Sequence, residues 1–192
     1  MRRYALPFLL LFCLLLAGCG QGIKDSVNWE ISEFTFKNQD GQDIGLEDLK
    51  GSVWVADFIF TSCETVCPPM TANMTDLNQR LTEEGIENIK FVSFSVDPEV
   101  DTPDKIKEYM SRYELDSENW HFLSGYSQES IEEFALKNFK TIAKKPETGD
   151  QVIHGTSFSL VNKEGIVVKN YSGLSNVPYD EIIKDIKVLN GE

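Results

Sequence analysis

The sequence is poor in basic residues, with 18 Lys and Arg against 31 Asp and Glu and a formal net charge of −13. So acidic a chain repels phosphate backbones, which argues against nucleic-acid binding. It also lacks internal repeats and low-complexity tracts, which excludes repeat architectures. Its 192 residues are enough for one domain with a sizeable core.

No long apolar run marks a membrane span at the N-terminus, where the apolar segment from Ala5 to Leu16 is shorter than the roughly 20 residues a typical transmembrane helix needs. With Arg2 and Arg3 before it, this segment predicts a secretory signal peptide over residues 1–18. The body of the protein is therefore expected outside the cytoplasm.

The end of that segment, Leu16-Ala17-Gly18-Cys19, resembles the lipobox of bacterial lipoproteins. The resemblance implies that Cys19 is lipidated and becomes the new N-terminus, that residues 19–30 form a lipidated tether, and that residues 31–192 form a domain on the extracytoplasmic face of the cell membrane. An ordinary cleaved signal, or a retained anchor with an incidental cysteine, is the alternative.

Cysteines are few. Of the four, Cys13 would leave with the signal peptide and Cys19 would be blocked by lipid, so Cys63 and Cys67 are the expected free thiols. In an oxidising compartment such a pair forms a disulfide, a metal site, or each in turn.

This pair follows a nearly continuous apolar run over residues 53–60, interrupted by Asp57, and precedes Pro68 and Pro69. The pattern predicts a buried strand, then a helix over about residues 68–84, with the thiols at the corner between them. A helix N-terminus stabilises thiolates, and residues four apart share a helix face. Both sulfurs can therefore face one metal ion or each other.

The remaining pattern alternates strands with helices. It predicts a hairpin with an Asp40-Gly41 turn, an exposed insertion over 140–151, strands over 89–96, 156–161 and 166–171, and helices opened by Thr102, Ser127 and Pro178. This order predicts an α/β fold, a thioredoxin-like sandwich with an added N-terminal β-hairpin and an insertion before the third core strand. In that architecture the cysteine corner faces the loop entering the third core strand, which here contains His154.

Three segments, residues 57–68, 95–103 and 154–157, together resemble the Sco (SenC) family from about Phe34 onward. The resemblance implies that copper is bound by Cys63, Cys67 and His154. It also implies a monomeric metallochaperone that helps assemble the dinuclear copper centre in subunit II of cytochrome c oxidase.

The donor chemistry favours the same metal. Two thiolates and an imidazole suit Cu(I), and Cu(II) can be held if water or another donor completes its coordination. A structural zinc site normally needs four protein ligands, and no fourth is evident. A purely structural disulfide between Cys63 and Cys67, and a loop role for His154, are the alternatives.

Other residues are assigned simpler roles. His121 is expected to be a bystander in a polar loop, and Met70 and Met74 are expected in the core because Leu77 and Leu81 continue their helical spacing. Asp57 resembles the buried aspartate of thioredoxins, which leaves a proton-handling or hydrogen-bonding role open.

Three further aspartates precede or open the second predicted helix. Asp97, Asp101 and Asp104 are expected to cap and start that helix, with support of the metal site as the alternative for Asp97.

A second function uses the same sulfurs: a thiol-disulfide oxidoreductase that reduces the cysteines of the oxidase copper site or senses redox state. Against it, thioredoxins use Cys-x-x-Cys whereas this chain has three residues between its cysteines, and the thioredoxin proline before the third core strand is replaced by Ile153-His154-Gly155-Thr156. A peroxidase is disfavoured because no convincing arginine partner is present. The sequence leaves open whether copper delivery or thiol reduction is the main task.

Overall fold

The computed structural model describes residues 22–115 and 118–191, and it is built on one six-stranded sheet with the order β1-β10-β9-β4-β5-β6. The neighbours β4, β5 and β6 run parallel, while β9 runs antiparallel to β4 and β10 antiparallel to β9. The strands are β1 (Trp29–Glu30), β4 (Val53–Ile59), β5 (Ile89–Ser95), β6 (Trp120–Leu123), β9 (Ser157–Val161) and β10 (Ile166–Ser172).

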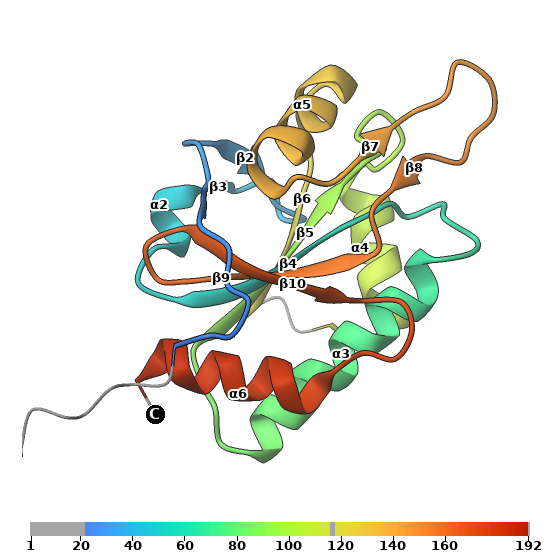
Figure 1. Ribbon diagram of the computed structural model, residues 1–192. Coiled ribbons are helices and arrows are strands. Elements are labelled where there is room, and N and C mark those ends of the chain that lie inside the picture. The colour runs from blue at the N-terminus through green and yellow to red at the C-terminus, as the bar shows by residue number, and fades with distance from the viewer. Residues whose placement is uncertain (1–21, 116–117, 192) are drawn as a thin grey trace, which may run out of the picture.

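Helices cover both faces of the sheet. Figure 1 shows α3, α4 and α6 on one side and α5 with the hairpin β2–β3 on the other. The helices are α2 (Leu46–Leu49), α3 (Cys67–Glu83), α4 (Pro103–Arg112), α5 (Gln128–Phe139) and α6 (Tyr179–Asn190). Because it lies between two helical layers, β4 is buried at all seven positions, as its apolar run predicts.

An aromatic core fills the space under α5. Phe58 and Phe94 stack at 5.2 Å across β4 and β5, and Phe134 and Phe139 of α5 lie 5.3 and 5.6 Å from Phe94. Phe34 joins this cluster from the N-terminal segment, 5.2 Å from Phe134. The alternate residues of β4 and β5 point to the opposite face, toward α3 and α4, because successive side chains on a strand alternate.

The predicted thioredoxin-like α/β sandwich is confirmed. The N-terminal hairpin is also present, with β2 (Thr35–Lys37) paired to β3 (Asp43–Gly45) and Gly41 at φ +76° in the connecting turn. The predicted helix starts hold, since the hydroxyls of Thr102 and Ser127 accept hydrogen bonds from the backbone N–H groups of Lys105 and Ser130.

Several short strands were not predicted. His121 was expected in a polar loop, but it lies in β6, where its Cα pairs with that of Val92. The insertion contains β7 (Ala143–Lys144), which pairs with β8 (Ile153–His154). Trp29–Glu30, part of the segment predicted as a tether, pairs with β10. Each of these strands has four residues or fewer, too few to show a periodicity.

The predicted signal peptide and Cys19 lie outside the described residues. Across residues 22–115 and 118–191, none of the helices combines the length and the hydropathy that crossing a membrane requires.

Candidate metal centre

The two cysteines lie at the corner between β4 and α3. The chain leaves β4 at Ile59, and α3 begins at Cys67 with prolines in its first turn. The backbone N–H of Cys67 donates to Cys63 Sγ at 3.3 Å, so the free amide end of the helix is directed at a sulfur. Both cysteines are free thiols, and Cys67 is fully buried while Cys63 keeps 7% of its surface exposed.

His154 reaches the same corner from β8. Its Nε2 lies 3.3 Å from Cys67 Sγ, and its ring packs edge-to-face on Phe60 with centroids 5.8 Å apart. Its Nδ1 lies 2.9 Å from the Gly155 carbonyl oxygen, which can only accept a hydrogen bond. Nδ1 therefore donates this hydrogen bond, which leaves Nε2 facing the thiols.

The three predicted ligands thus come together. Cys63 Sγ, Cys67 Sγ and a ring nitrogen of His154 all lie within 4.8 Å of one another, and they form the one such Cys/His/Asp/Glu cluster in the part of the chain that the structure describes. Two sulfurs bound at about 2.3 Å on opposite sides of one ion are about 4.6 Å apart. The cluster therefore has the size that a single metal ion requires.

The two thiols differ in acidity. The pKa of Cys63 is lowered, first by the hydrogen bond from Cys67 and then by His154 and the helix amides, which outweigh its partial burial. The pKa of Cys67 is raised, first by burial and then by its contact with Cys63. These opposite shifts favour a thiolate on the more exposed sulfur and a proton on the buried sulfur.

The SCO1/SenC family model matches residues 25–190 of the sequence. The chain belongs to the SCO1/SenC family. It is 58% identical to the SCO1 protein homolog of Bacillus subtilis (strain 168). The 178 aligned residues are 93% of this chain and 92% of that relative.

Solved SCO1/SenC structures have the same fold. A SCO1/SenC family lipoprotein from Bacillus anthracis str. Ames is 51% identical with a TM-score of 0.85 over 88% of this chain and 99% of that one. BsSco, a member of the Sco family of cytochrome c oxidase assembly proteins in which a disulfide switch was identified, is 58% identical, with a TM-score of 0.81 over 88% and 98%. Arabidopsis thaliana ScoI with copper bound is 25% identical, with a TM-score of 0.70 over 84% and 98%.

Asp57 lies in β4, six residues before Cys63, and is fully buried. Burial raises the pKa of its carboxyl to about 7, and the Ser93 hydroxyl and the charge of His154 offset only part of that effect. Among the described residues, neither carboxylate oxygen has a hydrogen-bond partner of ordinary geometry. A pKa in this range would allow Asp57 to exchange a proton near neutral pH, and its proton-handling role stays a prediction.

The expectation that Asp97 and Asp101 cap α4 is wrong, because the N-cap residue of α4 is Thr102. Both aspartates are buried, and each accepts a hydrogen bond from a segment that carries a predicted ligand. Asp101 binds the hydroxyl of Thr61, two residues before the first cysteine, at 2.6 Å, and Asp97 binds Lys145 Nζ at 2.8 Å. Their four-residue spacing was visible in the sequence, but their partners were not. Asp104 lies in the first turn of α4, as predicted.

The residues expected outside the site lie outside it. Met70 and Met74 are completely buried in the core. His121 is not part of the thiol cluster. Its pKa is lowered, first by burial and then by Lys90.

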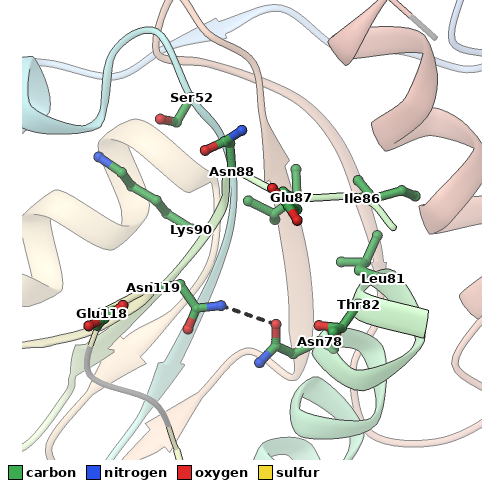
Figure 2. Close-up of a pocket in the computed structure, with 11 residues that line it drawn as sticks. Ser52, Asn78, Leu81, Thr82, Ile86, Glu87, Asn88, Lys90, Glu118 and Asn119 are labelled. Carbon is green, nitrogen blue, oxygen red and sulfur yellow. Dashed lines mark hydrogen bonds between the residues drawn. The ribbon is translucent and has the colours of Figure 1, made fainter. Parts of the chain in front are cut away.

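Two of the surface hollows lie at opposite ends of β4. One of about 390 Å³ lies beside Cys63 and is lined in part by Lys105 and Arg112. A larger one of about 580 Å³ lies at the opposite end of β4 and β5, where Asn119 donates to Asn78 at 3.2 Å (Figure 2). The larger hollow has no cysteine or histidine in its lining, so the metal chemistry belongs to the cysteine end.

Proposed function

We propose that this SCO1/SenC protein binds Cu(I) or Cu(II) through Cys63, Cys67 and His154 and delivers copper outside the cytoplasm. The observation that carries the proposal is the convergence of the three donor atoms within 4.8 Å. The copper-bound Arabidopsis ScoI supports the choice of metal, since it shares this fold at 25% identity.

The geometry suits a metal that must be both held and released. Two thiolates satisfy Cu(I), which accepts low coordination numbers, whereas Cu(II) also needs the nitrogen of His154 and a further donor. His154 is carried by a strand of only two residues rather than by the main sheet. The third ligand therefore comes from a different segment than the two thiols, and copper can gain or lose it while both sulfurs stay bound.

The receiving site in this proposal is the dinuclear copper centre of cytochrome c oxidase subunit II. BsSco, at 58% identity, is a member of the Sco family of cytochrome c oxidase assembly proteins, which supports this assignment. We further propose that a lipid on Cys19 tethers the protein to the cell membrane after removal of residues 1–18, a reading supported by the B. anthracis family lipoprotein.

A second function, reduction of the target's cysteines, is favoured by the unequal thiols. A more exposed cysteine of lowered pKa beside a buried one of raised pKa is the arrangement of a nucleophile and a resolving thiol. The disulfide switch identified in BsSco supports redox activity of such a pair.

Oxidase activity in cells that carry variants of the protein distinguishes copper delivery from thiol reduction. If copper delivery is the task, His154→Ala lowers oxidase activity and added copper partly restores it, while His121→Ala, the matched control, behaves as wild type. If thiol reduction is the task, His154→Ala keeps most activity while Cys63→Ser loses it. Normal oxidase assembly by a His154→Ala protein that no longer binds Cu(II) would reject copper delivery.

A further inference from the structure

The segment that leads to Cys63 and the hairpin β7–β8 that carries His154 both bind to one turn, residues 97–101, between β5 and α4. The turn is closed by its own backbone, because the N–H groups of Val100 and Asp101 both donate to the Asp97 carbonyl at 3.0 and 2.9 Å. Its two aspartates are each 2% exposed. A turn that is closed by its own backbone and has both aspartates buried is a firm support for whatever those aspartates bind.

Asp101 holds the cysteine segment. Its carboxylate accepts from the N–H of Thr61 at 3.1 Å and from the Thr61 hydroxyl at 2.6 Å, and it accepts from the Ser95 hydroxyl at 2.6 Å. The segment leading to Cys63 is thereby fixed to the end of β5.

Lys145 holds the histidine segment. Its Nζ donates to Asp97 at 2.8 Å and to Glu99 at 3.0 Å. The Asp97 side chain is 3% exposed and that of Lys145 25%, so this pair is shielded from water, unlike the surface pair of Lys144 with Glu132, whose lysine is 63% exposed. Shielded charge-assisted hydrogen bonds are stronger than exposed ones.

Apart from Lys145, the hairpin that carries His154 is held by the burial of Val152 and by the packing of the His154 ring on Phe60. Its strands β7 and β8 have two residues each, and two-stranded hairpins are marginally stable by themselves. Glu132 binds Lys144 and the backbone of Lys145, but it ties the hairpin to α5, not to the cysteine corner. Toward the cysteines, Gln151 donates to the Ser62 carbonyl at 3.4 Å from an exposed position.

We propose that Lys145 is a positioning residue for the metal centre: its ammonium joins the His154 hairpin to the same turn that fixes the cysteine segment. The contact sets the distance between His154 Nε2 and the thiols, and hence how readily copper gains its nitrogen ligand. The inference rests on the proposed role of His154 as a ligand.

The direction in which Cu(II) affinity changes when Lys145 is replaced distinguishes a positioning role from the effect of its charge. Lys145 is a cation, so removing its charge would by Coulomb's law raise the affinity for a metal cation. Positioning predicts the opposite, because a displaced imidazole is a poorer ligand. A lower Cu(II) affinity in Lys145→Met therefore cannot come from the lost charge.

The test is Cu(II) titration of the reduced protein, followed by visible absorption and paramagnetic resonance. Loss of groups that orient metal ligands typically costs 10–100-fold in affinity, so Lys145→Met is expected to bind Cu(II) about tenfold more weakly, with shifted sulfur-to-copper charge-transfer bands. Lys145→Arg should stay close to wild type. Lys144→Met, the matched control with the same charge change one residue away, should keep wild-type affinity and spectra. Cu(I) binding should be unchanged in all three.

Equal Cu(II) affinity in Lys145→Met and wild type would overturn the proposal, as would an equal loss in Lys144→Met. The midpoint of thermal unfolding of the metal-free protein is measured for each variant. If Lys145→Met and Lys144→Met both unfold at a lower temperature and lose Cu(II) affinity in proportion, the proposal is also overturned. His154→Ala is titrated alongside. If it binds Cu(II) normally, the ligand assignment fails, whereas weak binding by His154→Ala with normal binding by Lys145→Met rejects only the role of Lys145.

Discussion

Asp57 makes the folded protein sensitive to pH in a way that can be measured. Its carboxyl is fully buried, and burial raises its pKa from the ordinary 3.8 to about 7. In the unfolded chain the carboxyl loses its proton near pH 3.8, whereas in the folded protein it keeps the proton until about pH 7. Because the folded state binds the proton more tightly, the free energy of unfolding decreases as pH rises through this window.

The size of the effect follows from the two pKa values. A rise from 3.8 to about 7 amounts to about 4 kcal/mol at 1.36 kcal/mol per pKa unit. About 3 kcal/mol of this falls between pH 4.5 and pH 8 by the linkage relation. Asp57→Asn has nearly the same shape and no ionisation, so it lacks this loss.

Urea unfolding of the reduced, metal-free protein at several pH values between 4.5 and 8 gives the comparison. The stability of Asp57→Asn relative to wild type should increase by about 3 kcal/mol across that range. Asp43→Asn is the control, because its carboxylate lies in a surface ion pair with 61% of its side chain exposed. A constant difference between Asp57→Asn and wild type at every pH would refute the reasoning, since Asp57 would then titrate normally in the folded state.

Two further predictions concern the thiols and the anchor. The lowered pKa of Cys63 and the raised pKa of Cys67 predict that copper binding near pH 7 releases about one proton, which is measured with an indicator in weak buffer. Copper affinity should then rise about tenfold per pH unit, and release of two protons would contradict the unequal pKa values. Cys19→Ala should abolish lipid attachment and signal-peptidase processing, measured by labelled fatty acid and membrane fractionation, and a Cys19→Ala protein that still incorporates label would exclude that residue as the anchor.

The cysteine corner could be predicted from local sequence because its determinants are local. The apolar run of β4, the break at Thr61 and Ser62, and the prolines after Cys67 all lie within one short stretch and agree with one another. The convergence of His154 was different. It depends on a sheet in which β9 lies next to β4, and it could be expected only from the resemblance to a known architecture.

The contacts that support the site could not be predicted. Asp101 binds Thr61 across 40 positions of sequence, and Asp97 binds Lys145 across 48. Asp97 precedes Pro98, and Asp101 precedes Thr102. Aspartates at such positions are typical of a helix start, so the sequence provided no reason to expect distant partners for them. His121 was misplaced for a related reason, since β6 has only four residues and its burial comes from β5 rather than from its own pattern.

The central claim is that His154 completes a copper site with Cys63 and Cys67, and X-ray absorption of the Cu(II)-loaded reduced protein tests it most directly. The wild type should show two sulfur donors and an imidazole nitrogen, with further light donors completing the sphere. His154→Ala should lose the imidazole signal, keep both sulfurs and bind Cu(II) at least a hundredfold more weakly, since loss of a direct ligand exceeds the 10–100-fold cost of losing a supporting group. Identical spectra and affinities for His154→Ala and wild type would contradict the assignment.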